Sequence, residues 1–219
     1  MLAPNTDKAR FNMVEQQIRP CDVIDERVLE AFKIIPREHF VDEEQRPLAF
    51  ADTHLPLPNG EVMMKPLQEG IMLQALDVQP GDRALEIGTG SGFVTACLVH
   101  LGSKVTSYEI DSEQGIRATE RLAELGIDAE LVTDDIFATD LPEGGFDVIA
   151  VTGSLPQLSE RLERLLAPGG RMFQVKGEPP VMCAILVTRA EDGTLLRKGL
   201  CETLLPPLKN APQPEHFVF

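Results

Sequence analysis

The length, composition and charge of the chain exclude several classes of protein. Its 219 residues, 43% of them hydrophobic, allow one main domain with an extension, and its formal net charge of −15 disfavours nucleic acid as a partner, because phosphate binding relies on clustered Lys and Arg. No apolar run approaches the roughly 20 residues of a membrane span, and the first residues lack a secretory pattern, so we expect no membrane partner and a soluble, cytoplasmic protein.

The first 80 residues do not show the alternation of strand-like and helix-like segments that the rest of the chain shows. A helix is predicted around Asp25 to Ile34, and a proline-rich loop follows between Pro47 and Pro66. We predict that residues 1–80 form a helical and loop extension, packed on a core domain of residues 81–219.

From about Gly81 to Val187, short β-branched or apolar runs alternate with longer helix-like stretches, which predicts a mostly parallel twisted sheet with helices on both faces. The predicted strands are 83–87, 104–110, 129–132, 146–151 and 171–176. The predicted helices are 92–101, a helix from about Ser112, capped by that serine, to Gly126, and 157–166. Runs 181–190 and 194–205 flank a turn and predict a C-terminal antiparallel hairpin. The fold class is therefore α/β and Rossmann-like.

The strongest chemical signal is the sequence Leu-Glu-Ile-Gly-Thr-Gly-Ser-Gly at 85–92, where a predicted strand meets a helix. Glycines at such a turn let a ligand approach the backbone closely. A dinucleotide fingerprint would place its third glycine at position 93, which is Phe93 here, so the spacing favours S-adenosylmethionine (SAM) over NAD. Glu86 supplies a carboxylate that orients the turn or meets a cationic amine, which NAD lacks. The predicted cofactor-binding residues of this turn are Glu86, Gly88, Thr89, Gly90, Ser91 and Gly92.

Further polar side chains follow the later strands. Glu109 ends the second predicted strand, where a carboxylate can accept hydrogen bonds from both ribose hydroxyls of SAM or NAD. Asp134, Asp135 and Ile136 follow the third predicted strand. One of the two acidic side chains can accept a hydrogen bond from the adenine amino group, although either aspartate can instead cap a helix. Thr152 ends the fourth and is a candidate to line the acceptor site. Open α/β sheets bind ligands at these strand ends, so we predict one cofactor site there.

The cysteines and histidines predict no metal centre. The four cysteines lack the C-x-x-C spacing of a zinc or redox site, and we expect them to be reduced packing residues. His39 and His54 are isolated in sequence, and an isolated histidine is more often structural than catalytic. No Ser-His-Asp pattern is present.

These motifs and their flanking segments resemble the protein-L-isoaspartate (D-aspartate) O-methyltransferase family. The resemblance covers about residues 10–210, in family order, through segments 13–20, 28–41, 48–60, 85–92, 146–156 and 166–177. It implies a cytoplasmic repair enzyme that uses SAM to methylate the abnormal carboxylate of isoaspartyl residues in a protein or peptide partner.

Two departures from the family pattern bear on that function. Where the family has Thr-Ile-Ser-x-Pro, with its Ser hydroxyl near the reacting groups, this chain has Val62-Met63-Met64-Lys65-Pro66. Met64 takes the place of the serine, although paired methionines can also be core gap-fillers. The usual Gly-Asp-Gly reads Thr133-Asp134-Asp135. The candidate catalytic positions are Met64 and Thr152, and the candidate substrate-binding residues are Met63, Met64, Pro66, Thr152 and Val175.

Methyl transfer from a sulfonium to a carboxylate needs no general base, because the acceptor is already ionised at pH 7. The residues must hold oxygen, carbon and sulfur in line and exclude water. Loss of one hydroxyl therefore predicts weakened or redirected acceptor recognition with SAM binding intact. Three alternatives stay open: a SAM-dependent methyltransferase with another, small acceptor, a SAM-binding protein without catalysis, and a nicotinamide dehydrogenase. The sequence carries no prediction of oligomeric state.

Overall fold

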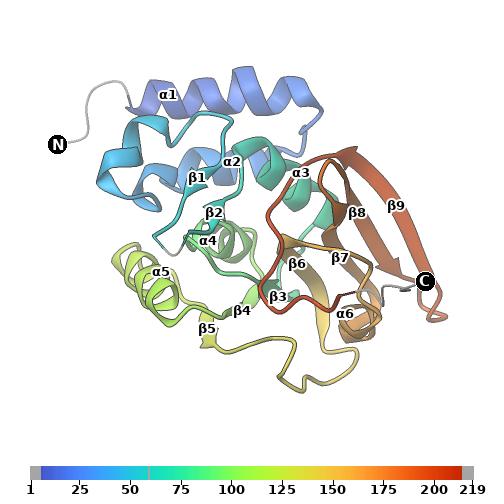
Figure 1. Cartoon of the computed structure of the whole chain (residues 1–219). Coiled ribbons are helices and arrows are strands. Elements are labelled where there is room, and N and C mark those ends of the chain that lie inside the picture. Colours follow the sequence, from blue (N-terminus) through green and yellow to red (C-terminus); the bar gives the residue numbers. More distant parts are fainter. Residues whose placement is uncertain (1–5, 59, 214–219) are drawn as a thin grey trace.

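The structure of the protein is a computed structural model that describes residues 6–58 and 60–213. Its centre is a seven-stranded sheet of order β5-β4-β3-β6-β7-β8-β9 (Figure 1). Neighbouring strands from β5 to β7 are parallel, whereas β8 and β9 form the predicted antiparallel hairpin. The strands are β3 Arg83–Ile87, β4 Lys104–Glu109, β5 Glu130–Thr133, β6 Phe146–Leu155, β7 Leu166–Glu178, β8 Val181–Arg189 and β9 Leu195–Glu202.

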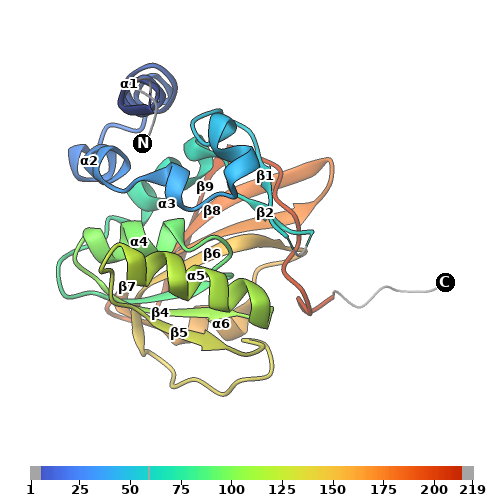
Figure 2. The same cartoon turned by 90° about the vertical axis from the view of Figure 1, so that its left-hand side faces the viewer.

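Helices cover this sheet in layers. Figure 2 shows α1 and α2 outermost, α4 and α5 beneath them, and then β4 and β5. The α-helices are α1 Thr6–Asn12, α2 Glu26–Ile34, α3 Pro66–Leu76, α4 Phe93–His100, α5 Ser112–Glu124 and α6 Glu160–Leu165. Shorter pieces are a π-helical turn Met13–Ile18, 3-10 turns Arg19–Cys21, Arg37–His39 and Glu43–Leu48, and a two-stranded antiparallel ribbon of β1 Leu55–Pro56 and β2 Val62–Met63.

The central strands bury both of their faces. Successive residues of a strand point to opposite faces, and Ala84 lies in one hydrophobic cluster while Leu85 lies in the other. The first cluster contains residues of α2, α3 and α4, and the second contains Leu162 and Leu165 of α6. Helices therefore pack on both faces, which confirms the predicted Rossmann-like class.

Two predicted helix boundaries are corrected. The cap of α5 is Asp111 instead of Ser112, because Asp111 has an extended backbone and its Oδ1 accepts from Gln114 N at 3.0 Å. The helix predicted over 157–166 is limited to α6, because Ser159 is its extended N-cap and Leu166 already pairs in β7. Strands β6 and β7 are correspondingly longer than the runs of apolar residues that predicted them.

The N-terminal extension and the sheet domain share one hydrophobic core. Phe32 of α2 meets Phe93 of α4 edge to face, with 5.5 Å between ring centroids, and one cluster runs from Met13 to Leu205. The division at residue 80 stays a prediction, and both of its intervals extend into terminal residues outside the described part. No helix of the described residues is long and apolar enough to cross a membrane.

Candidate active site

The glycine turn between β3 and α4 has a backbone that only glycine adopts readily. Gly88, Gly90 and Gly92 have φ values of 93°, 52° and 88°. A Cβ on Gly88 would lie 2.5 Å from Thr152 Oγ1, whereas Gly92 packs against Ala118 of α5. The Gly88 and Thr89 amides donate to Tyr108 O at 2.8 and 3.2 Å, which fixes the turn beside the end of β4.

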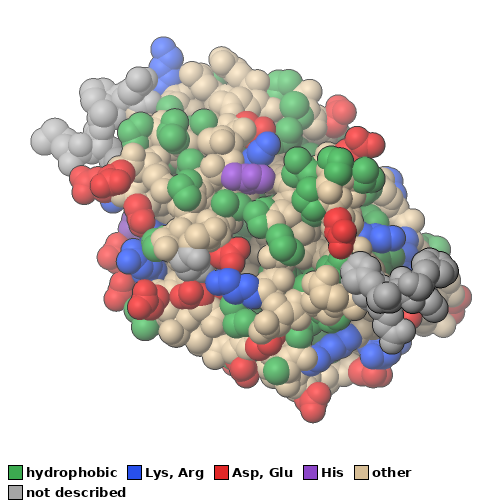
Figure 3. Space-filling view, in the orientation of Figure 1, with side chains coloured by type: hydrophobic (Ala, Val, Ile, Leu, Met, Phe, Trp, Pro, Cys, Tyr) green, Lys and Arg blue, Asp and Glu red, His purple; other side chains and the backbone are tan. Residues whose placement is uncertain are grey.

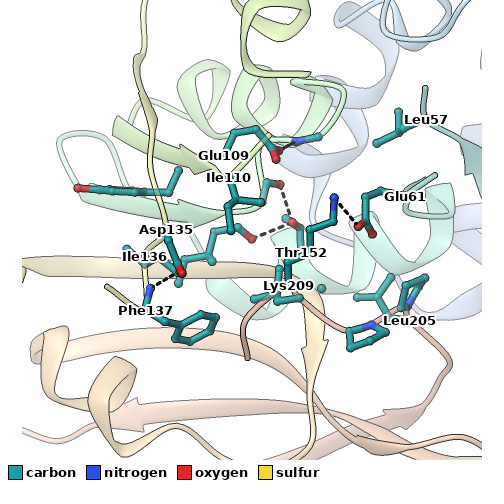
Figure 4. A pocket seen from close by; sticks show the side chains of 18 of the residues that line it. Leu57, Glu61, Glu109, Ile110, Asp135, Ile136, Phe137, Thr152, Leu205 and Lys209 are labelled. Carbon is teal, nitrogen blue, oxygen red and sulfur yellow. Dashed lines mark hydrogen bonds and ion pairs between the residues drawn. The ribbon is translucent and has the colours of Figure 1, made fainter. Parts of the chain in front are cut away.

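A pocket of about 730 Å³, its open mouth included, lies beyond the carboxyl ends of β3 to β6 (Figure 4). The pocket, which we call the outer pocket, brings together six of the predicted cofactor residues: Gly88, Gly90, Glu109, Asp134, Asp135 and Ile136. It also contains Thr152, which was predicted to line the acceptor site. Its other walls include Ile110, Phe137 and residues 205–209, which the sequence did not indicate.

Glu109 is placed to accept two more hydrogen bonds inside this pocket. Its Oε2 accepts from Gly90 N at 2.8 Å and its Oε1 from Asp111 N at 3.0 Å. These contacts fix the carboxylate, and each oxygen keeps a free lone pair. The arrangement fits a pair of neighbouring hydroxyls, such as those of a ribose.

The side chains of the two acidic residues after β5 accept hydrogen bonds from their own loop and from Asn210. Asp134 accepts from Asp135 N at 2.8 Å and from Thr139 Oγ1 at 3.0 Å. Asp135 accepts from Phe137 N and from Asn210 Nδ2, both at 2.8 Å. Both aspartate side chains therefore make loop contacts and also line the pocket. The apolar residues Ile110, Ile136 and Phe137 line the same pocket and suit a planar base.

A smaller cavity of about 280 Å³, the inner chamber, adjoins the outer pocket. The two share Val62, Gly88, Gly90 and Thr152, and the inner chamber is also lined by Met63, Met64, Glu69, Glu86, Thr89, Ser91 and Val94. The structure thus places both methionines beside the glycine turn. Met64 also borders a narrow apolar crevice that is lined by Val175, while Pro66 begins α3 and lines neither this crevice nor the two pockets.

Glu86 is a buried acid with one unsatisfied oxygen. Its Oε2 accepts from Ser107 Oγ at 2.7 Å and from Thr95 Oγ1, while Oε1 has no hydrogen-bond partner among the described residues. Burial raises the pKa of this carboxyl to about 7, against the lowering effect of the two hydroxyls. Ser107 Oγ also lies at hydrogen-bond distance, 2.6 Å, from Thr89 Oγ1, so Ser107 connects Glu86 to the glycine turn.

Thr152 holds the glycine turn through its hydroxyl. Thr152 Oγ1 lies 2.6 Å from Gly88 O and 2.9 Å from Ile87 O, and its single proton must go to one of these carbonyls. The hydroxyl is therefore not free to donate to an acceptor carboxylate.

Sequence reasoning missed a buried ion pair behind the inner chamber. Arg37 and Glu69 contact each other through their charged groups, and both are essentially inaccessible to solvent. Arg37 also donates to Met64 O at 2.7 Å and to Ala49 O at 2.9 Å, and its guanidinium lies 4.7 Å from the Phe93 ring centroid. Burial raises the pKa of Glu69, and the adjacent Arg37 charge opposes that rise.

The isolated histidines make structural contacts. His39 Nε2 lies 3.1 Å from Arg121 O, and His54 Nε2 lies 2.9 Å from Gln68 Oε1. Within the described residues no group of three His, Cys, Asp or Glu side chains is arranged to hold a metal ion, and all four cysteines are free.

Known proteins share both the sequence and the fold. The family model of protein-L-isoaspartate(D-aspartate) O-methyltransferase matches residues 8–211. Protein-L-isoaspartate O-methyltransferase 2 of Anaeromyxobacter sp. (strain Fw109-5) is 37% identical over 87% of this chain and 78% of its own length. The corresponding enzyme of Koribacter versatilis is 36% identical over 92% of this chain and 90% of its own.

Among solved structures, a protein-L-isoaspartate O-methyltransferase from Plasmodium falciparum in complex with S-adenosyl-L-homocysteine superposes with a TM-score of 0.80. It is 22% identical, and the match covers 93% of this chain and 98% of that one. The fold and the strand-end pocket define a Rossmann-like methyltransferase. The chain belongs to the protein-L-isoaspartate (D-aspartate) O-methyltransferase family, which confirms the resemblance.

Proposed function

We propose that this chain is a SAM-dependent methyltransferase that esterifies isoaspartyl carboxylates in proteins or peptides, and that it acts in the cytoplasm. One observation carries the proposal: a single pocket unites the glycine turn, Glu109 and the Asp134–Asp135 pair in a chain of this family. The residues fit SAM by their chemistry. Gly88 lines the pocket with its backbone alone, and Glu109 keeps free lone pairs. Glu86, which has one unpartnered oxygen, lines the chamber that a cationic amine would approach.

In the proposed complex Glu109 binds the ribose hydroxyls, and one of the two aspartates with Ile136 binds the adenine. Bound SAM would supply an electrophilic methyl group on its sulfonium. The backbone of the glycine turn orients that end of the cofactor toward the inner chamber, to which the buried Met63 and Met64 contribute apolar lining. An acceptor carboxylate is ionised near pH 7, so none of these side chains has to remove a proton.

We assign Thr152 a positioning role, because its hydroxyl proton goes to the carbonyl groups of the turn. Met64 supplies no hydrogen bond to the acceptor, and its backbone carbonyl is held by Arg37. We therefore expect the cofactor site to be intact and acceptor binding to be weaker than it would be with a serine at position 64. A hydrogen bond to a charged group contributes about 1.5–3 kcal/mol.

The test is transfer of a labelled methyl group from SAM to an isoaspartyl peptide, measured as a base-labile ester. The matched control is the same peptide with normal aspartate, which should accept no methyl group. Equal labelling of both peptides, or none, would contradict the proposed activity.

A second candidate is a methyltransferase for a different acceptor, favoured by the lining of the inner chamber. Met63, Met64, Glu69 and Glu86 give that chamber thioethers and acids, which suit an uncharged or cationic group better than a carboxylate. If this candidate is right, methyl transfer to at least one amine or hydroxyl acceptor in a panel will be faster than transfer to the isoaspartyl peptide. A SAM-binding protein without catalysis would show calorimetric SAM binding and no transfer to any acceptor.

A further inference from the structure

The chain that follows β9 forms one wall of the outer pocket. Residues 203–211, which we call the C-terminal strap, pass along the ends of the central strands (Figure 1). Five consecutive residues of the strap line the pocket: Leu205, Pro206, Pro207, Leu208 and Lys209. Figure 4 shows Leu205 and Lys209 among the side chains around the cavity. A cofactor in this pocket would therefore be in contact with the strap.

The beginning of the strap is fixed by Gln68 of α3. Its Nε2 donates to Thr203 Oγ1 at 2.6 Å and to Leu204 O at 2.9 Å. Gln68 Oε1 accepts from Lys65 N at 3.1 Å, so the same side chain reaches the segment that carries Met64.

The middle of the strap is fixed against the end of β6. Ser154 N donates to Pro206 O at 2.8 Å, and Leu208 N donates to Ser154 O at 2.9 Å. A Cβ on Gly153 would come within 2.6 Å of Leu208 Cδ2, so the close approach depends on glycine at that position.

The far end of the strap is attached to two opposite walls of the pocket. Lys209 Nζ lies 3.3 Å from Glu61 Oε1 beside β2, and Asn210 Nδ2 donates to Asp135 Oδ2 at 2.8 Å beside β5. The lysine pair is partly exposed and contributes little, because water screens such pairs. Asn210 has a φ of 57°, a left-handed backbone that asparagine tolerates better than most residues. Asp135 stands where the resembled family pattern has glycine.

We propose that Asp135 and Asn210 form a latch that holds the C-terminal strap over the bound cofactor and thereby sets its residence time. The proposal rests on the proposed SAM pocket. Movement of the far end of the strap, which carries the pocket-lining Lys209, must break the hydrogen bond between Asn210 and Asp135, whereas residues 203–208 stay anchored by Gln68 and Ser154. The latch is a positioning pair: it acts on the cofactor by keeping the pocket wall in place.

The experiment measures the dissociation rate of S-adenosyl-L-homocysteine by stopped-flow displacement. Asn210→Gly removes the amide and keeps the left-handed backbone, and Asp135→Ala removes its partner. Each variant should release the ligand about five- to tenfold faster, which is less than a buried hydrogen bond to a charged group would give, because water competes for this exposed contact. The double variant should be no faster than the faster single variant, because both changes break the same contact.

Two controls separate the latch from general loosening. Asp192→Ala removes an exposed acid that accepts from Thr194 N at 2.9 Å in the β8–β9 turn, and it should leave the rate unchanged. Asn210→Asp places two carboxylates together and should speed release, whereas Asp135→Asn/Asn210→Asp restores a donor and an acceptor and should slow it again.

A further measurement compares two ligands that differ only in the base. It separates an effect of the strap from a change in the recognition of adenine. The preference for S-adenosyl- over S-inosyl-homocysteine should be the same in Asn210→Gly as in the wild type, because Asn210 does not line the pocket. Loss of that preference, rates that multiply in the double variant, or no change in release would each overturn the latch. If the wild type binds no S-adenosyl-L-homocysteine, the proposed function fails as well, whereas binding with unchanged release in Asn210→Gly overturns the latch alone.

Discussion

Met64 is the residue on which we expect the acceptor specificity of this enzyme to depend most. It is buried, borders both the inner chamber and the apolar crevice with Val175, and presents a thioether where the family pattern has a hydroxyl. Its backbone carbonyl is fixed by Arg37, so the side chain alone distinguishes this position from the family pattern.

Met64→Ser should therefore raise kcat/KM for an isoaspartyl peptide by about tenfold or more, because a hydroxyl can donate to the charged acceptor. The affinity for S-adenosyl-L-homocysteine, measured by calorimetry, should stay unchanged. Met63→Leu is the matched control and should leave the activity near that of the wild type. No gain in Met64→Ser would show that the hydroxyl position does not limit recognition.

Glu86 makes the stability of the fold depend on pH. Its pKa in the fold is about 7, raised from 4.5 by burial, so between these values the native state binds more protons than the unfolded state. The contribution of Glu86 is therefore most favourable below about pH 4.5 and is lost as pH rises through 7.

Glu86→Gln should remove this loss, because an amide does not ionise. The unfolding free energy of the variant, relative to the wild type, should rise by about 3 kcal/mol from pH 4.5 to pH 8. Urea unfolding at a series of pH values measures this difference. A difference that does not vary with pH would contradict the assignment of the raised pKa to Glu86.

At the scale of elements, the strand–turn–helix unit of β3 and α4 was predictable because its signals are local. Three glycines with positive φ and a β-branched or apolar strand specify the turn without any distant residue. The partner of that unit was not predictable. Thr152 lies 64 residues after Gly88, and its hydroxyl occupies the space that a Gly88 side chain would need.

Gly88→Ala should raise the dissociation constant for S-adenosyl-L-homocysteine by at least about tenfold, since backbone strain of about 1–2 kcal/mol adds to the clash. Gly88→Ala/Thr152→Ala should recover part of the affinity, because it removes the oxygen that is in contact. Gly126→Ala is the matched control: Gly126 also has positive φ, at 66°, but a Cβ there meets nothing within 4 Å. It should reduce stability and leave the affinity intact. Equal affinity losses in the two single variants would contradict the steric argument.

At the scale of the whole molecule, the net charge of −15 acts on every acceptor that approaches. On the face shown in Figure 3, acidic side chains lie mainly around the rim, and hydrophobic side chains occupy the middle. A long-range field of this sign repels an acidic peptide and attracts a basic one.

The kcat/KM for an acidic isoaspartyl peptide should therefore rise several-fold as salt increases from about 10 to 200 mM, while that for a basic peptide should fall. Steady-state assays with two peptides that differ only in flanking charges measure the effect. A neutral peptide is the control, and the same salt response for all three would exclude steering by the protein's field.

For residues 81–202 the sequence by itself determined the succession of strands and helices along the chain, the glycine turn, and the acids at successive strand ends. These follow from periodicity, turn chemistry and the geometry of parallel sheets, which are properties of short segments. It did not determine which distant residues meet. The Arg37–Glu69 pair behind Met64, the carbonyl groups that take the Thr152 proton, and the strap held by Gln68 and Asn210 each join segments far apart in the chain. Only the packing of the extension and the C-terminal segment around the sheet decided those contacts, because no local pattern encodes a long-range partner.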